Sequence, residues 1–278
     1  MRPPFFVCAF VLGALPGPGF AGSLRAQSVE TTHAKVELLA DVTAVDSGQT
    51  VRLGVHFVLE KGWHIYWENP GDSGQPPVLK WKVPEGFTAG GIQWPRPERM
   101  QTNARVVDYG YHDEVLLIVP MRAPQRIPTH PGEASFAVEA KWLICREVCL
   151  PERATLALSL PMGTRGKANP SVEQIFRETL RRLPHPLPAG WSARAISGKN
   201  EFVLAVRRGK SIANAVFFPL EPGQIDNAAP QKAEATADGA RITLQKSDQL
   251  LKPIVVLNGV LALADGASYK IHARVANQ

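Results

Sequence analysis

Two cysteines separated by three residues are the side chains of this sequence best suited to chemistry. Cys145 and Cys149 could form a disulfide with each other, exchange it with the thiols of another protein, or bind a soft metal ion. Arg146 lies between them, and Lys141 and Arg153 are close by in the sequence. Because nearby cations favour the thiolate form of a cysteine, these surroundings suit thiol–disulfide exchange.

Alternating apolar and polar residues around the cysteines predict a β-hairpin over residues 136–160. With the three intervening residues as the turn, Cys145 faces Cys149 and Ile144 faces Leu150. Both strands then share one apolar face, which a shift of one residue would destroy. The cysteines fall on the opposite, solvent-facing side at the hairpin tip, where opposed Cα atoms are about 4.5 Å apart and can be bridged by a disulfide.

A disulfide across so short a loop would stabilise the fold only modestly, by roughly 2 kcal/mol. We therefore favour a redox-active pair, bonded at rest and readily reduced, over a structural staple. A third alternative is a soft metal site formed by the cysteines with His64 and His112. The sequence has no Cys/His cluster at zinc-finger spacing and no Met-rich tract, so we expect no metal and no cofactor.

The first 26 residues have the features of an export signal. Arg2 provides the positive start, and Phe5 to Leu15 an apolar run that is too short to span a bilayer. Cleavage of residues 1–26 would remove Cys8 and leave Cys145 and Cys149 as the only cysteines. We expect the mature chain to be exported and to have no transmembrane segment.

Length and charge restrict the classes of protein to which this chain can belong. The chain has 278 residues and a formal net charge of +6. Its arginines and lysines do not form a cluster with aromatic residues. This argues against a nucleic-acid-binding protein. The sequence also has no phosphate-binding glycine loop and no HExxH motif. The length is sufficient for two modest domains.

The segment up to Pro161 is predicted to be all-β. Residues 34–39 and 51–58 alternate around a turn at Asp46 to Gly48, and Val78 to Trp81 and Val115 to Pro120 are further strand candidates. Many short strands separated by Gly and Pro are typical of a sandwich, and we expect an immunoglobulin-like one.

An aromatic strand followed by a polar loop is the second unusual feature of this half. Trp63, Ile65 and Trp67 occupy alternate positions and are expected to pack in the core. The Pro- and Gly-bearing loop Asn69 to Gly74 is too polar for core, and such a stiff loop commonly has a function. A second aromatic stretch begins at Tyr109.

These stretches together resemble the N-terminal periplasmic domain of the thiol:disulfide interchange protein DsbD, and more closely its relatives of the suppressor-of-copper-sensitivity (ScsB) type. The resemblance lies in Gly62-Trp63-His64-Ile65-Tyr66-Trp67, Tyr109-Gly110-Tyr111 and Trp142-Leu143-Ile144-Cys145 with Cys149-Leu150-Pro151. It implies an immunoglobulin-like periplasmic domain. It also implies a cysteine pair that takes electrons from a membrane-embedded donor, here a separate polypeptide, and passes them to thioredoxin-fold proteins.

The resemblance also implies a loop that covers the disulfide. Cys145 and Cys149 would be the catalytic pair, and Asn69 to Gly74 the loop. The expected neighbours are Tyr66, Asn69, Asp72, Ser73, Tyr109 and Tyr111. We expect the loop to limit access to the disulfide, and Asp72 to raise the pKa of a nearby thiol. Deleting Asp72 to Gly74 would then speed reaction with small thiols without lowering the melting temperature much.

The C-terminal half is predicted to be a second, smaller β-sandwich. Residues 163–170 are expected to form a linker, and Ser171 to cap a short helix that ends before Pro184. The predicted strands are Glu201 to Val206, Ala215 to Phe218, Ala240 to Leu244, Pro253 to Leu257 and Tyr269 to Val275. The expected divisions are residues 1–26, 27–165, 166–186 and 187–278, with the last folding independently as a scaffold or docking module.

Three functions fit these patterns. The first, which we favour, is a thiol–disulfide oxidoreductase that relays reducing equivalents to or from thioredoxin-fold partners. The alternatives are a copper-handling protein and a non-catalytic binding or adaptor protein with a structural disulfide.

Overall fold

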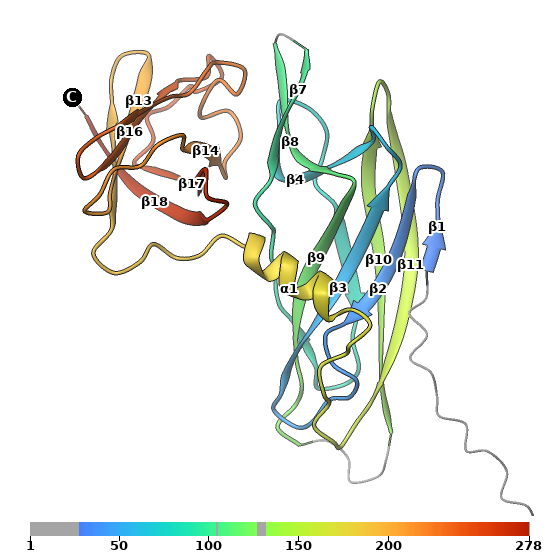
Figure 1. Cartoon of the computed structure of the whole chain (residues 1–278). Coiled ribbons are helices and arrows are strands. Elements are labelled where there is room, and N and C mark those ends of the chain that lie inside the picture. The colour runs from blue at the N-terminus through green and yellow to red at the C-terminus, as the bar shows by residue number, and fades with distance from the viewer. Residues whose placement is uncertain (1–27, 104, 127–131, 278) are drawn as a thin grey trace, which may run out of the picture.

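The computed structural model describes residues 28–103, 105–126 and 132–277. The expected export signal, with Cys8, lies outside these residues. Within them, the regular structure consists of β-strands and a single helix, α1 (Glu173–Arg182), as Figure 1 shows. The prediction of an all-β protein with one short helix is confirmed.

Two antiparallel sheets form the N-terminal part of the molecule, which we call the first module (β1 to β11). The first sheet has the order β1-β2-β3-β9-β6. Its strands are β1 (Ser28–Glu30), β2 (Ala34–Ala40), β3 (Thr50–Leu59), β6 (Thr88–Ala89) and β9 (Glu114–Arg122). The second sheet has the order β11-β10-β4-β8-β7, with β5 paired to β10. Its strands are β4 (His64–Gly71), β5 (Val78–Lys82), β7 (Glu98–Asn103), β8 (Val106–His112), β10 (Glu133–Cys145) and β11 (Cys149–Pro161).

The core of the first module lies between these sheets. Alternate residues of β3, such as Leu53, Val55 and Phe57, are buried and meet buried residues of β10 such as Phe136 and Trp142. For example, the rings of Phe57 and Trp142 pack edge to face with centroids 5.1 Å apart. The two-residue period of the apolar pattern therefore generates a sandwich, as predicted.

The hairpin that carries both cysteines has the predicted register. Cys145 is opposite Cys149, Ile144 is opposite Leu150, and Phe136 is opposite Leu158. The turn consists of residues 146–148. The register is fixed because the apolar residues of both strands must face the same core.

The strand before the polar loop is longer than predicted. We expected a loop from Asn69 to Gly74, but β4 continues to Gly71, and its pairing with β8 shifts between Tyr66 and Gly71. Such an irregularity lets a strand run through residues with weak β propensity, here Asn69 and Pro70. The loop proper begins at Asp72, and we refer below to Asp72–Gly74 as the loop.

The helix α1 covers the outer face of the first sheet. Phe176 is buried against Leu116 and Ile118 of β9, so this strand is buried on both sides. The predicted N-cap is wrong: the helix is preceded by Val172 without a side-chain cap, and Ser171 instead donates to Asn169 Oδ1. The preceding segment is also attached to the first module, since Asn169 donates to the carbonyl of Ala40.

The C-terminal strands form one continuous seven-stranded sheet, which we call the second module. Its order is β14-β17-β18-β12-β13-β16-β15. The strands are β12 (Ser192–Ser197), β13 (Glu201–Arg207), β14 (Val216–Pro219), β15 (Lys232–Ala235), β16 (Gly239–Gln245), β17 (Val256–Ala262) and β18 (Ser268–Asn277). Two strands, β12 and β15, were not predicted, and β17 begins at Val256 rather than Pro253. The sheet curves around its own core, which includes Phe202, Leu204 and Ile242.

The two modules meet through a shared aromatic contact. Phe218 of β14 packs edge to face on Trp67 of β4 and Tyr109 of β8, with ring centroids 6.3 and 5.3 Å apart. Phe218, Val260 and Ala262 belong to the same buried cluster as the core of the first module. The second module is therefore packed on the end of the second sheet.

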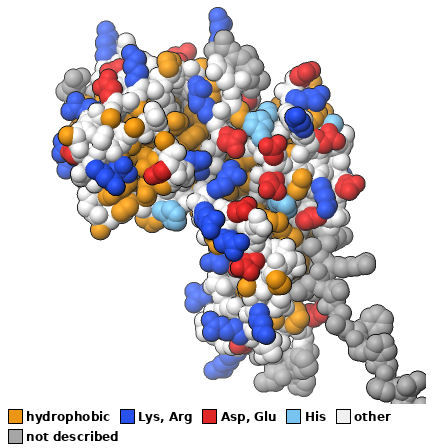
Figure 2. Space-filling view, in the orientation of Figure 1, with side chains coloured by type: hydrophobic (Ala, Val, Ile, Leu, Met, Phe, Trp, Pro, Cys, Tyr) orange, Lys and Arg blue, Asp and Glu red, His pale blue; other side chains and the backbone are white. Residues whose placement is uncertain are grey.

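The surface gives few further indications. In the face shown in Figure 2, basic and acidic side chains are interspersed over both modules. Among the described residues, the one helix is neither long nor apolar enough to cross a bilayer.

Candidate redox site

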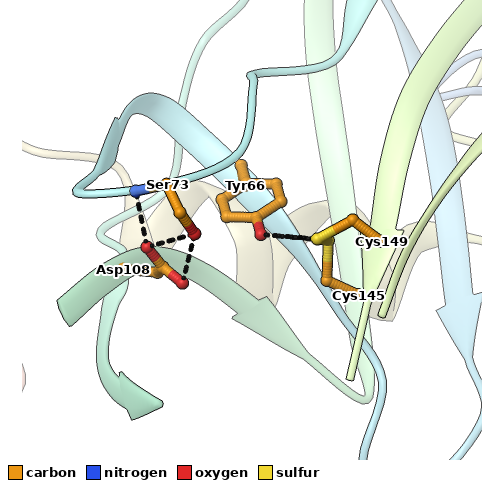
Figure 3. Close-up of a disulfide and its surroundings, with 5 residues drawn as sticks. All are labelled: Tyr66, Ser73, Asp108, Cys145 and Cys149. Carbon is orange, nitrogen blue, oxygen red and sulfur yellow. Dashed lines mark hydrogen bonds between the residues drawn. A yellow bond between two sulfur atoms is a disulfide. The ribbon is translucent and has the colours of Figure 1, made fainter. Parts of the chain in front are cut away.

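The two cysteines form a disulfide at the tip of the β10–β11 hairpin (Figure 3). The S–S distance is 2.08 Å and the Cα atoms are 4.2 Å apart. The two residues differ in exposure: Cys149 is exposed, whereas only 2% of Cys145 is accessible. Our expectation that both lie on a solvent-facing surface is therefore wrong for Cys145.

Cys145 is buried because β4 lies beside it. Cys145 pairs with His64, and Tyr66 is on the same face of β4, two residues further along. The Tyr66 hydroxyl donates to Cys145 Sγ at 3.0 Å and lies 3.5 Å from Cys149 Sγ. As predicted from the resemblance, Tyr66 is a neighbour of the pair, and its hydroxyl lies against the buried sulfur.

The loop supports Tyr66 from behind. Glycine is required at position 74 for two reasons. A Cβ there would lie 2.1 Å from Tyr66 Cζ, and the φ of +76° is one that residues with a side chain rarely adopt. Ser73 is fixed beside it, since its backbone N–H and its hydroxyl both donate to Asp108 at 2.9 Å. The loop thus reaches the disulfide through Tyr66.

Asp108 is a member of the site that sequence reasoning missed. Burial raises the pKa of Tyr66, and the nearby negative charge of Asp108 raises it further, while the Ser73 hydroxyl opposes both. The phenol is therefore held neutral, as a donor to sulfur. The signal that could have found Asp108 is the pairing of the two aromatic strands: Tyr66 is opposite Gly110, so Asp108 lies on the same face of the sheet.

Asp72 and Asn69 are directed away from the sulfurs. Asp72 accepts hydrogen bonds from the backbone N–H of Val107 and from Asn227 Nδ2, at 2.8 and 2.7 Å. Asn69 is buried and donates to the carbonyl of Pro219 at 2.8 Å. Both residues therefore bind the second module, and the expected effect of Asp72 on a thiol pKa has no support from its position.

Tyr109 and Tyr111 also lie elsewhere. They occupy the alternate positions of β8 and point into the core, where both are fully buried. The Tyr109 hydroxyl donates to Asn227 Oδ1 at 2.9 Å, and the Tyr111 hydroxyl to the carbonyl of Pro95 at 2.8 Å. The structure does not bring these two residues to the disulfide.

His64 and His112 form a ring pair next to Cys145 and Tyr66. Their ring centroids are 5.6 Å apart, and the His64 ring is 5.3 Å from that of Tyr66. Burial lowers the pKa of His64, the His112 charge lowers it further, and Asp108 opposes them. Within the described parts of the chain, no group of three or more His, Cys, Asp or Glu residues is arranged to hold a metal ion.

The hairpin tip is fixed by a stack of side chains. Trp63 is buried between His33, stacked at a centroid distance of 3.7 Å, and the Arg146 guanidinium, 5.2 Å from the indole centroid. Since Arg146 is in the turn between the cysteines, this cation–π contact restrains the turn. Next to it, Val148 is 60% exposed.

Comparisons with known proteins agree with this architecture. Residues 33–161 match the family described as "Thiol:disulfide interchange protein DsbD, N-terminal". The crystal structure of the N-terminal periplasmic domain of ScsB from Proteus mirabilis superimposes with a TM-score of 0.67 at 17% identity, over 91% of this chain and 98% of that one. The predicted resemblance to DsbD, closer to its ScsB-type relatives, is therefore confirmed.

Two other solved structures align less well. The GAE domain of yeast GGA1 and the periplasmic chaperone SfaE have TM-scores of 0.27 and 0.21, too low to carry an argument. No curated protein matches the chain.

Proposed function

We propose that this chain is a periplasmic thiol–disulfide exchange protein that relays reducing equivalents through Cys145 and Cys149. The observation that carries the proposal is the asymmetry of the disulfide: one cysteine is exposed at a hairpin tip and the other is buried on a hydroxyl donor. The match of residues 33–161 to a thiol:disulfide interchange family and the likeness to a periplasmic domain support it.

Exchange would begin at the exposed sulfur. A thiolate of the partner attacks Cys149 Sγ, the S–S bond breaks, and the electron pair leaves on Cys145 Sγ. The Tyr66 hydroxyl, which already donates to this sulfur, stabilises the negative charge that develops there. The phenol keeps its proton because its pKa is raised.

A second partner thiolate would complete the transfer. It attacks the partner's own sulfur in the mixed disulfide and releases Cys149. Two electrons then pass from the partner's dithiol to the cysteine pair, the partner keeps a disulfide, and Cys145 and Cys149 end as thiols after proton uptake. The same steps in reverse let the reduced pair reduce a partner.

Thioredoxin-fold proteins and a membrane-embedded electron donor are the partners we propose. The exposed Val148 next to Cys149 offers an apolar contact for them. The chain itself would act as the protein-disulfide reductase module between them.

Equilibration with glutathione buffers tests the proposal. A redox-active pair should have a reduction potential above about −300 mV, whereas structural disulfides have potentials below this value. The fraction of reduced protein can be measured after alkylation by mass spectrometry. A potential well below about −300 mV would instead identify Cys145–Cys149 as a staple.

A further inference from the structure

We propose that the second module controls access to the buried sulfur of the disulfide, Cys145 Sγ, and that Asn227 is the positioning residue through which it acts. The inference rests on the proposed function, because access matters only to a disulfide that exchanges. Its basis is a continuous series of contacts from Asn227 through the loop Asp72–Gly74 to Tyr66 and the sulfurs.

Asn227 is held rigidly between the modules. It is buried, its Oδ1 accepts from Tyr109, and its carbonyl accepts from Arg99 at 2.8 Å. Its Nδ2 is thereby directed at Asp72 Oδ1, 2.7 Å away. A buried asparagine whose side-chain oxygen, side-chain nitrogen and backbone carbonyl are all hydrogen-bonded has little freedom to move.

Asp72 transmits this constraint to the loop. Its second oxygen accepts from the Val107 backbone N–H, and its own N–H donates to the Val107 carbonyl at 3.0 Å. The next residue, Ser73, is bound to Asp108, and the one after it, Gly74, lies against the Tyr66 ring. Three successive residues thus join the second module, the β8 strand and the tyrosine that donates to Cys145 Sγ.

The contact differs from an ordinary packing interface in one respect. None of the hydrogen-bond partners of Asn227 is part of the disulfide. Substitution of Asn227 therefore cannot change the chemistry of the sulfurs directly. It can only release the loop, and Tyr66 with it. Moving Tyr66 opens the side of the buried Cys145 Sγ that its hydroxyl now occupies. A small reductant that makes no other contacts with the protein can then attack Cys145 Sγ, with the electron pair leaving on Cys149 Sγ. This route does not use the Tyr66 hydrogen bond to Cys145, so the predicted consequence is faster reduction.

The variant N227D tests this with the least change of shape. It replaces the amide donor by a carboxylate oxygen opposite Asp72, while the oxygen that accepts from Tyr109 is retained. Losing a hydrogen bond to a charged group and adding like-charge repulsion should raise the rate of reduction by tris(2-carboxyethyl)phosphine about tenfold or more. This phosphine reduces a disulfide to two thiols and is oxidised to its oxide with water.

The second module offers a matched control. Asn258 donates to Glu221 at 2.9 Å and its Oδ1 bonds His272, so N258D creates the same carboxylate pair away from the loop. N258D should leave the reduction rate unchanged. The exchanged variant D72N/N227D should restore the slow rate, because the amide introduced at position 72 can donate to the carboxylate introduced at position 227 and still accept from Val107.

Folding of each variant is checked by near-UV circular dichroism; if N227D does not fold, N227A takes its place. A folded Asn227 variant with the wild-type rate would overturn the inference. Equal acceleration by N227D and N258D, or no rescue by D72N/N227D, would also overturn it, because general loosening would then explain the result. Failure of the proposed function is separate: it would appear as no exchange with protein dithiols, whatever the phosphine rate.

Discussion

We expect Tyr66 to determine both the accessibility of the Cys145 sulfur and which of the two sulfurs leaves during exchange. Its hydroxyl lies against the buried Cys145 Sγ and donates to it, and this is the sulfur that would leave in exchange. Phe at this position keeps the ring and removes the donor. Because a hydrogen bond to a charged group contributes about 1.5–3 kcal/mol, Y66F should exchange with dithiothreitol roughly tenfold more slowly.

The control for this prediction is Y111F. The Tyr111 hydroxyl is buried and bonded to the Pro95 carbonyl, so its removal costs stability in the same sandwich without affecting a sulfur. Equal rates for Y66F and the wild type, or equal slowing by Y111F, would show that the Tyr66 hydroxyl has no part in exchange. Rates can be followed by acid quenching and separation of the reduced and oxidised forms.

His64 should make the stability of the first module depend on pH. Its pKa in the folded protein is lowered below the ordinary 6.5 by burial and by His112, with Asp108 opposing. As the pH falls below 6.5, the unfolded chain takes up a proton that the folded chain does not, so stability decreases until the folded pKa is reached. Above this ordinary value the effect is absent.

The variant H64Q isolates this contribution. The difference in unfolding free energy between wild type and H64Q should change between about pH 7.5 and about pH 5, with the wild type losing more stability on acidification. Urea unfolding at each pH measures it. Parallel curves for the two proteins would exclude His64 as the source of the pH dependence.

At the scale of elements, the loop Asp72–Gly74 is the part whose position the sequence could not establish. Its polar residues identified it as unusual, but they interact with Asn227 and Asp108, which are distant in sequence or on another strand. Deleting it would remove these hydrogen bonds. We therefore expect the deletion to lower the melting temperature as well as to speed reduction, which corrects the expectation from the sequence.

The prediction for this element is a substitution at Gly74. In G74A the added Cβ would overlap the Tyr66 ring, so the loop or the ring must move away, and reduction by small reductants should become several-fold faster. Gly209 has a φ of +77°, close to that of Gly74, with no atom near its Cβ position. G209A therefore carries the same backbone strain and should leave the rate unchanged; a rate increase in both variants would refute the loop's role.

The hairpin was predictable because its information is local. Alternation in residues 136–160 fixed the register, and the register placed Cys145 opposite Cys149. The burial of Cys145 was not predictable in this way, because the covering residue, Tyr66, comes from a strand whose pairing to β10 is limited to Cys145 and His64. The end of β4 was misplaced for a related reason, since Asn69 has its partner, Pro219, in the second module.

At the scale of the whole molecule, the two modules share a buried aromatic cluster. Phe218 packs on Trp67 and Tyr109, and belongs with the core of the first module. The independent folding of residues 187–278 remains a prediction. That segment has a core of its own, but separation would expose Phe218, Val260 and Ala262.

Neighbouring phenylalanines allow this coupling to be tested. F218A removes the shared contact, whereas F217A removes a side chain from the core of the second module alone. Each truncation should cost about 3–5 kcal/mol. The full chain should melt in one calorimetric transition, and F218A should divide it into two; a single transition in F218A would show that the modules are coupled by other contacts.

The most direct test of the proposed relay is to trap its mixed disulfide. Oxidised protein is mixed with a reduced thioredoxin-fold protein whose resolving cysteine has been replaced by alanine, and the linked peptides are identified by mass spectrometry. We predict a mixed disulfide at Cys149, with Cys145 released as the free thiol. A folded protein whose disulfide stays intact under these conditions, or a link at Cys145, would contradict the proposed relay.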